Sequence, residues 1–322
     1  MKHILITGAN GFLGIHLESH LYKQGYGVTS AYRESHKDFR NPLVSNAVDT
    51  NRYKRVFLHK IDSQTDWSSY LEEIDCVIHL LGKAHSFYDN ELTSYLETNS
   101  KITEKLAQDC AKNETQFIFM STALVHGNSC QSAIQETDPY RGFNSYSLSK
   151  IKAEQALQKL YNTEDLQYAI LRPPMIYGSY GKGNFQRLYT LLRRGLPLPF
   201  ASITNRRSFL FIGNLLDAVS HLLQRDTLAN DSYLLADPED LSTPELIRQM
   251  AKHLRQSSRL FPFPLTVLKA MLKPIGKAEE VEKLQQSFYL DTTKIRTELA
   301  WKPPYSNEAG IKSTLEFLKQ ET

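Results

Sequence analysis

Two side chains at helical spacing could carry out proton transfer. Tyr146 and Lys150 stand in the stretch YSLSK one helical turn apart, so they share one face of a helix. A tyrosine with a pKa of about 10 is a poor acid–base catalyst at neutral pH, but a neighbouring ammonium favours the phenolate. We therefore expect Lys150 to lower the pKa of Tyr146 toward the working range. The alternative is an exposed pair on a solvated helix.

Two hydroxyl side chains at the end of a predicted strand could act together with this tyrosine–lysine pair. Ser121 and Thr122 end the apolar run QFIFMST, which predicts a strand over residues 116–122. Ligands bind outside the carboxyl ends of the strands in open parallel sheets. A hydroxyl at this position can hydrogen-bond a substrate oxygen and share its proton with Tyr146.

Three glycines lie between the first predicted strand and the first predicted helix. Gly8, Gly11 and Gly14 occur in ITGANGFLG with the spacing G-x-x-G-x-x-G. The first suits a tight turn, the second lets backbone approach a pyrophosphate, and the third allows close packing of the helix on the strand. The start of the helix offers free N–H groups to phosphates. This context favours a dinucleotide site over an ordinary glycine turn.

A basic residue ends the second predicted strand. Arg33 follows VTSAY, and an acidic residue at this place would bind the 2′-hydroxyl of NAD and repel a 2′-phosphate. Arginine instead offers a planar donor fork that suits a phosphate. The sequence therefore favours NADP(H), with NAD as the alternative. Glu34 follows directly, and a solvated strand-end arginine is the other interpretation.

Alternating strands and helices must position these groups. Strands are predicted at residues 3–7, 28–32, 55–61, 76–82, 116–122 and 167–173, with helices at 12–25, 91–112 and 145–160. This order predicts a doubly wound parallel sheet, the Rossmann α/β fold. Residues 1–173 would form the dinucleotide-binding domain, and residues 174–322 a smaller, mainly helical substrate lobe. Stretches 208–213 and 232–237 could return to the first domain as strands.

Composition excludes several classes of protein. The 322 residues carry 38 basic and 35 acidic side chains, a net charge of +3 that is too small for a dedicated nucleic-acid binder. Three scattered cysteines predict neither a disulfide framework nor a metal site. We find no signal peptide and no apolar run long enough to span a bilayer. We expect a cytoplasmic protein with no membrane partner.

Together these motifs resemble the extended short-chain dehydrogenase/reductases that act on nucleotide sugars, the NAD-dependent epimerase/dehydratase family. Further stretches that are similar to family segments are VIHLLG (77–82), LRPPMIYG (171–178), NRRSFLFIGNLLDAV (205–219) and DTTKIRTELAWKPP (291–304). The resemblance implies that Thr122 polarises the sugar oxygen. It implies that Tyr146 is the general acid/base, and that Lys150 lowers its pKa and holds the nicotinamide ribose. A homodimer is expected on the same ground.

The resemblance also implies which residues contact ligands. Those expected to bind the cofactor are Gly8, Gly11, Phe12, Leu13, Gly14, Arg33, Asp62, Leu80, Leu81, Gly82, Asn99, Tyr146, Lys150 and Pro173. Those expected to border the substrate are Lys83, His85, Thr122, Asn184 and Arg207. Among these, Arg207 would clamp the diphosphate of a UDP-sugar, because arginine binds phosphate oxygens in bidentate fashion. Asn184 is also compatible with a helix N-cap, and Asp62 with a strand-end turn.

Several functions fit these residues. Two long stretches, RRGLPLPFASITNRRSFLFIGNLLDAV and LLADPEDLSTPELIRQMA, resemble a branch that acts on UDP-N-acetylhexosamines in bacterial surface polysaccharide synthesis. The first hypothesis is NADPH-dependent reduction of the C4 keto group of a UDP-4-keto-6-deoxy-N-acetylhexosamine. The alternative is a UDP-glucose or UDP-N-acetylglucosamine 4-epimerase that keeps NAD bound. A 4,6-dehydratase is disfavoured because Ala123 and Leu124, not a carboxylate pair, follow Thr122. A non-catalytic dinucleotide-binding regulator is the remaining hypothesis.

Overall fold

The computed structural model describes residues 1–44, 49–84, 91–276 and 278–321. It divides into two compact units. The first contains residues 1–127, 136–173 and 216–234, and the second contains residues 128–135, 174–215 and 235–322. No helix in the described part of the chain is long and apolar enough to cross a membrane.

A parallel sheet forms the centre of the first unit. Its strands are β1 (His3–Thr7), β2 (Gly27–Arg33), β3 (Tyr53–Leu58), β4 (Cys76–His79), β5 (Gln116–Met120), β6 (Tyr168–Arg172) and β9 (Asp231–Leu234). They lie in the order β3-β2-β1-β4-β5-β6-β9, and every neighbouring pair is parallel. The prediction of a parallel, doubly wound α/β sheet is confirmed. The stretch expected as a strand at 232–237 supplies the edge strand β9.

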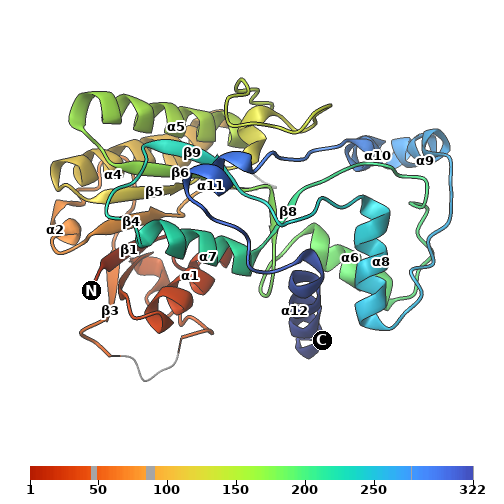
Figure 1. The fold of residues 1–322 in the computed structure, drawn as a ribbon, viewed down its shortest axis with the longest axis horizontal. Coiled ribbons are helices and arrows are strands. Elements are labelled where there is room, and N and C mark those ends of the chain that lie inside the picture. The colour runs from red at the N-terminus through yellow and green to blue at the C-terminus, as the bar shows by residue number, and fades with distance from the viewer. Residues whose placement is uncertain (45–48, 85–90, 277, 322) are drawn as a thin grey trace. The chain divides into compact units, whose positions relative to one another are not determined.

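Helices cover both faces of this sheet. In Figure 1, α1 (Phe12–Lys23) and α7 (Ile212–Leu223) lie on one face, and α4 (Ile102–Lys112) and α5 (Ser145–Glu164) lie on the other. The smaller helix α2 spans Ser68–Leu71. The central strands β1, β4, β5 and β6 are largely apolar, as a sheet buried on both faces requires, whereas the edge strand β3 is partly exposed. One core cluster joins Leu5, Val77, Phe117 and Ile170 of the strands to residues of α4 and α5.

The predicted helix 91–112 is interrupted. The chain forms α3 (Leu92–Leu96), then a π-helical turn over Glu97–Lys101, and then α4. Such wide turns insert an extra residue, and they occur frequently at functional sites. Here the turn contains Asn99, one of the predicted cofactor contacts.

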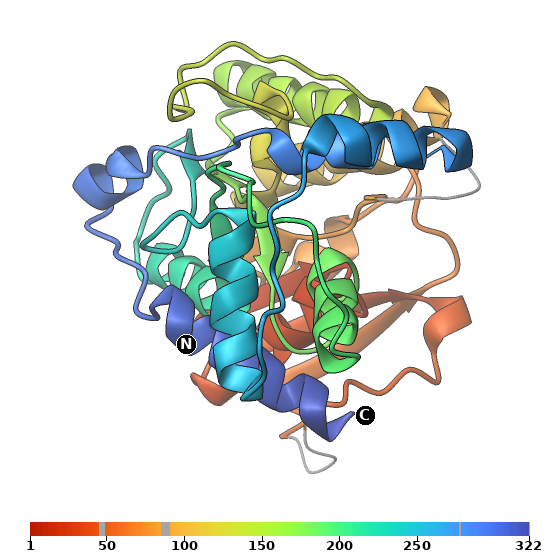
Figure 2. The same cartoon turned by 90° about the vertical axis from the view of Figure 1, so that its right-hand side faces the viewer.

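The second unit is mainly helical, as predicted. Its helices are α6 (Asn184–Arg193), α8 (Thr243–Leu254), α9 (Leu265–Leu272), α10 (Ala278–Gln285), α11 (Thr293–Glu298) and α12 (Asn307–Gln320). Figures 1 and 2 show α8 beside α12, which it contacts. Two short parallel strands, β7 (Met175–Tyr177) and β8 (Phe209–Phe211), complete it. The stretch expected as a strand at 208–213 is therefore partly strand, and it pairs with β7.

Candidate active site

The carboxyl ends of the parallel strands bring the predicted cofactor residues to one edge of the sheet. Gly8 follows β1, Leu80 follows β4, and Pro173 follows β6, while Arg33 is the last residue of β2. Thr122 lies two residues beyond β5. Because β2, β1, β4, β5 and β6 are adjacent in that order, these residues line a single edge. Dinucleotides and their substrates bind at this edge in open α/β sheets.

The glycine turn has no room for side chains. Gly8 has a φ of +74°, and a Cβ there would lie 2.8 Å from the backbone N of Leu81. A Cβ at Gly14 would lie 2.4 Å from the carbonyl oxygen of Gly8. Gly11 caps α1 without any side-chain hydrogen bond, so the first N–H groups of the helix remain available to a ligand. This turn fits the pyrophosphate of a dinucleotide. Phe12 and Leu13 form the first turn of α1 and are partly buried.

A methyl group at Gly14 should damage this turn. We expect Gly14→Ala to destabilise the fold by about 1–3 kcal/mol, because backbone must move to admit the new atom. Affinity for NAD(H) should fall with it. Thermal unfolding and quenching of protein fluorescence by NADH measure the two effects.

The matched control for that variant is Gly25→Asn. Gly25 has open space around it, and asparagine tolerates its φ of +94° better than most residues. Both losses should be absent in this control. Unchanged stability and NADH affinity in Gly14→Ala would contradict the close packing of the turn.

Arg33 is exposed, and the carboxylate that follows it is hydrogen-bonded to a histidine. The Glu34 carboxylate is 3.0 Å from Nδ1 of His59. The carboxylate that follows Arg33 therefore has a partner other than Arg33. Asp62 pairs with Lys60 at 2.5 Å and accepts a hydrogen bond from the backbone N of Gln64, and both interactions lower the pKa of Asp62.

The acid–base pair lies at the start of α5. Asn144 and Ser147 form a capping box there, which fixes where the helix begins. Lys150 is 4% exposed, and its Nζ donates to the carbonyl oxygen of Met120 at 2.8 Å. The same Nζ lies 4.4 Å from the ring centre of Phe119. Burial lowers the pKa of Lys150 to about 8.

The structure brings Thr122 and Tyr146 together. Thr122 is buried, and its Oγ1 accepts a hydrogen bond from the backbone N of Leu124 at 3.2 Å. Burial raises the pKa of Tyr146 to about 12, although its hydrogen bond with Thr122 acts in the opposite direction. The expectation that Lys150 lowers this pKa below the ordinary value is therefore wrong for this structure. Desolvation of the phenol outweighs the hydrogen bond with Thr122, and Tyr95 raises the pKa further.

The low pKa of Lys150 can be measured directly. In a lysine-labelled sample, we expect one side-chain NMR signal to titrate with a midpoint near pH 8, because the ammonium is buried and loses its hydration. That signal should be missing from Lys150→Met. Were no lysine signal to titrate in that region, the burial of this ammonium in solution would be disproved.

Asn99 connects the π-helical turn to α5 and to the loop after β4. Its Oδ1 accepts from the backbone N of Lys83 at 2.6 Å, and its Nδ2 donates to Ser149 Oγ at 2.9 Å. A Cβ at Gly82 would lie 3.2 Å from Asn99 Oδ1 and 3.4 Å from Lys150 Nζ. Gly82, Asn99 and Lys150 therefore converge. The Lys83 ammonium donates to Ser94 Oγ at 2.9 Å, and His85 lies outside the described residues.

A buried ionic network behind these residues was missed from the sequence. Glu154 and Arg172 form an ion pair at 2.6 Å, and their side chains are 0% and 2% exposed. Ser121 Oγ also donates to Glu154, and Tyr140 Oη donates to it at 2.8 Å. Arg172 Nη1 lies 3.1 Å from Nε2 of His126. The only local signal was the position of Glu154, one helical turn after Lys150.

The substrate residues of the second unit have mixed environments. Asn184 is exposed in the first turn of α6, and Gly183 is the N-cap, so the N-cap interpretation of Asn184 is wrong. Arg207 donates through Nη1 to the carbonyl oxygen of Lys283 at 3.0 Å, and burial lowers its pKa. Its neighbour Arg206 lines a cavity of the second unit.

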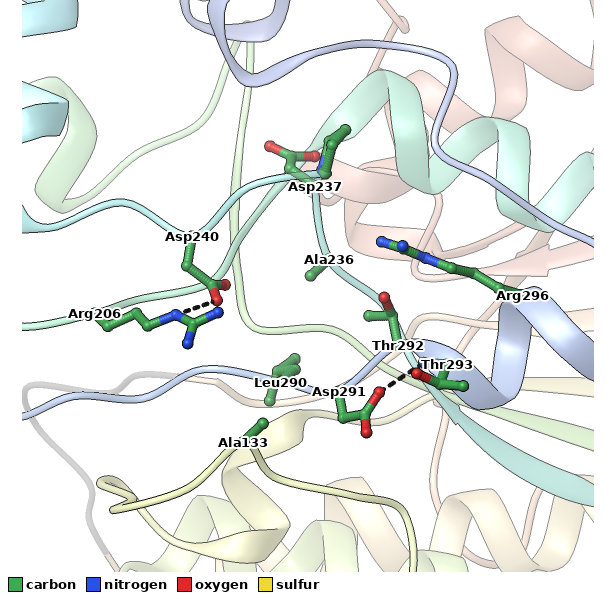
Figure 3. Close-up of a pocket in the computed structure, with 11 residues that line it drawn as sticks. Ala133, Arg206, Ala236, Asp237, Asp240, Leu290, Asp291, Thr292, Thr293 and Arg296 are labelled. Carbon is green, nitrogen blue, oxygen red and sulfur yellow. Dashed lines mark hydrogen bonds and ion pairs between the residues drawn. The ribbon is translucent and has the colours of Figure 1, made fainter.

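That cavity has a volume of about 260 Å³. Figure 3 shows Arg206 bonded to Asp240 in it, with Asp237, Asp291 and Arg296 around it. Its carboxylates have hydrogen-bond partners, which are Arg206 for Asp240 and the backbone N of Thr293 for Asp291. Asp237 accepts hydrogen bonds from Tyr177 and Asn214.

Comparisons with known proteins agree on one family. A family model described as "NAD dependent epimerase/dehydratase family" matches residues 4–236. A UDP-glucose 4-epimerase of Vibrio cholerae is 32% identical, over 99% of this chain and 96% of the relative. An Escherichia coli O157:H7 protein, named N-acetyl-alpha-D-glucosaminyl-diphospho-ditrans,octacis-undecaprenol 4-epimerase, is 26% identical over 98% and 95% of the two chains.

Solved structures share the fold. A UDP-N-acetylglucosamine 4-epimerase from Methanobrevibacter ruminantium M1 superposes with a TM-score of 0.80 at 17% identity, covering 100% of this chain and 99% of that one. A UDP-glucuronic acid 4-epimerase from Bacillus cereus, solved with NAD, gives a TM-score of 0.77 at 22% identity over 100% and 99% of the two chains.

Proposed function

Because the chain belongs to the NAD dependent epimerase/dehydratase family, an extended short-chain dehydrogenase/reductase family of nucleotide-sugar enzymes, we propose that it is a 4-epimerase of a UDP-hexose or UDP-N-acetylhexosamine. The observation that carries the proposal is the cluster of Thr122, Tyr146 and Lys150 at the carboxyl edge of the sheet. The full-length similarity to a UDP-glucose 4-epimerase supports the choice of reaction. This choice reverses the order of our first two hypotheses.

Each residue at the carboxyl edge of the sheet would have a separate role in the proposed reaction. Bound NAD would supply reversible hydride transfer at C4 of the sugar. The glycine turn Gly8–Gly14 would hold its pyrophosphate, and Lys150 would hold the nicotinamide ribose. Thr122 would donate a hydrogen bond to the C4 oxygen. Tyr146 would remove the hydroxyl proton from that oxygen and later restore it.

A single assay tests the proposed reaction. Purified protein is incubated with UDP-glucose and, separately, with UDP-N-acetylglucosamine, without added cofactor, and the sugars are followed by proton NMR. We expect the C4 epimer to accumulate to an equilibrium mixture in at least one reaction. No epimer with either sugar, even after NAD is added, would refute a UDP-sugar 4-epimerase.

A second candidate is the 4-keto reductase, which one observation favours. Arg33 is exposed where a 2′-phosphate would lie, and the neighbouring Glu34 carboxylate is engaged by His59. An arginine fork at that place suits NADPH, which a net reductase consumes. The discriminating reaction supplies a UDP-4-keto-6-deoxy-N-acetylhexosamine with NADPH. Consumption of NADPH there, together with no epimerisation of UDP-N-acetylglucosamine, would favour the reductase.

Substitution of Arg33 checks this cofactor argument. If Arg33 contacts a 2′-phosphate, Arg33→Asp should weaken NADPH binding by about 10–100-fold, the loss of a charge-assisted contact, and leave NADH binding nearly unchanged. Titration of each dinucleotide by fluorescence gives both constants. The matched control is Arg40→Asp, an exposed arginine seven positions further along the chain. Equal affinities for NADPH in wild type and Arg33→Asp would remove the argument for NADP(H).

Asn184 and Arg207 remain proposed ligands of the substrate's diphosphate. Arg207 supports this role because its guanidinium is only partly buried and bonds to one backbone carbonyl rather than to a carboxylate. An arginine in this state can still bind phosphate oxygens. Arg207→Met should therefore raise the KM for the UDP-sugar more than it changes kcat.

A further inference from the structure

Helix α9 presents apolar side chains to its surroundings. Six of its eight residues, in the sequence LTVLKAML, are apolar, and none is buried. Val267 is 45% exposed and Met271 is 65% exposed. A surface helix ordinarily turns its apolar stripe toward a core. In the described part of the second unit, α9 packs beside α10, as Figure 1 shows, and this packing leaves those two side chains uncovered.

The segment before α9 extends this apolar surface. Phe261 is 38% exposed, and its ring contacts that of Phe263 with centres 6.1 Å apart. Pro262 and Pro264 alternate with these two rings and restrict the backbone there. A hollow of about 410 Å³ beside them is lined by Phe263, Leu265 and the two prolines, among others. Residues 261–272 therefore form one strip of exposed apolar groups, which we call the apolar strip.

Basic residues flank the apolar strip. No acidic residue occurs between Glu245 and Glu279. The same interval contains seven lysines and arginines, which are Arg248, Lys252, Arg255, Arg259, Lys269, Lys273 and Lys277. Lys252 is ion-paired with Glu308 and Lys269 with Glu282 of α10, whereas Lys273 follows α9 directly and is exposed. The strip therefore combines exposed apolar side chains with nearby positive charges. Such a combination is complementary to a surface whose outer layer is anionic and whose interior is apolar.

We propose that the apolar strip is a peripheral contact for an anionic lipid bilayer. Val267, Met271 and Phe261 would enter the boundary between headgroups and acyl chains, and Lys273 would meet lipid phosphates. At a rise of 1.5 Å per residue, the eight residues of α9 measure about 12 Å, so the helix would lie in the plane of the interface rather than across it. The sequence analysis expected no membrane partner, so this proposal reverses that expectation.

A bilayer fits the strip better than a second copy of the chain does. A stable protein–protein contact needs about 800 Å² on each partner, and a strip of this length offers much less. A twofold contact would also place Lys273 and Arg259 of one copy near the same residues of the other, which is repulsive. The homodimer expected from family resemblance would therefore use another surface.

Vesicle sedimentation tests the proposal with the full chain. We expect the protein to sediment with vesicles of phosphatidylglycerol mixed with phosphatidylcholine, and not with vesicles of phosphatidylcholine alone. The double variant Val267→Ser/Met271→Ser should bind the anionic vesicles about tenfold more weakly, because two apolar anchors are lost. Lys273→Glu should also weaken binding, and added salt should reduce the wild-type binding.

Control variants distinguish a specific role of the apolar strip in vesicle binding from a general effect of substituting an exposed side chain. Tyr161→Ser removes a side chain that is 41% exposed on α5, and it should bind vesicles as the wild type does. Because the replaced side chains are exposed, circular dichroism should show the same fold in every variant. The proposal is overturned if the wild type ignores anionic vesicles, binds neutral ones equally well, or binds as strongly after the double substitution. It is also overturned if the double variant instead dissociates an oligomer that does not bind vesicles.

Discussion

Replacing Tyr146 with phenylalanine is expected to lower kcat by about 10²–10⁴-fold, the usual contribution of a positioned acid–base group. The phenol is hydrogen-bonded to Thr122 and is the acid–base group proposed for the C4 hydroxyl. Loss of one oxygen atom leaves the ring packing in place. Thermal unfolding and NADH affinity should therefore stay close to the wild-type values.

The pH dependence gives this test a second readout. In the free protein, burial raises the pKa of Tyr146 to about 12 and lowers that of Lys150 to about 8, so the protonated phenol predominates at neutral pH. Activity that depends on the phenolate should therefore rise with pH in the wild type, and this rise should vanish in Tyr146→Phe. Tyr161→Phe, on the exposed surface of the same helix, is the matched control. Full turnover by Tyr146→Phe would remove this residue from the proposed mechanism.

Replacing Glu154 with glutamine should cost about 3–5 kcal/mol of unfolding free energy, the range for breaking a buried ion pair by removing one partner. Arg172 would then be a fully buried cation that has lost its carboxylate partner. Glu154 also accepts hydrogen bonds from Ser121 and Tyr140, so the end of β5 and the segment before α5 would lose a common anchor. Urea unfolding followed by circular dichroism measures the loss.

Two comparisons make the Glu154 prediction specific. Glu164→Gln changes the same residue type at the exposed end of α5, and it should stay within about 0.5 kcal/mol of the wild type. The double variant Glu154→Gln/Arg172→Met should be more stable than Glu154→Gln alone, because no buried charge is left behind. The carboxylate also raises the pKa of Lys150 against the effect of burial, so that pKa should fall further in Glu154→Gln. A single variant as stable as the wild type would show that the pair does not hold α5 to the sheet.

Much of the first unit could be predicted from local patterns. Central strands such as HILIT and QFIFM are short apolar runs, and the spacing of the three glycines in ITGANGFLG lies within one strand-to-helix turn. The Tyr146–Lys150 spacing likewise depends on a single helix. The second unit was predicted only in outline, because its short strands β7 and β8 carry three residues each and have little periodicity.

The sequence by itself determined the parallel sheet, the glycine turn and the identity of the groups at its edge, because these depend on near neighbours in the chain. Only the tertiary structure decided how those groups are charged and what supports them. The pKa of Tyr146 is raised rather than lowered because burial in the folded chain disfavours the charged phenolate. Glu154 meets Arg172 across 18 residues, and Arg172 meets His126 across 46. Burial and long-range pairing depend on contacts between segments that are distant in the sequence, so a local sequence pattern cannot predict them.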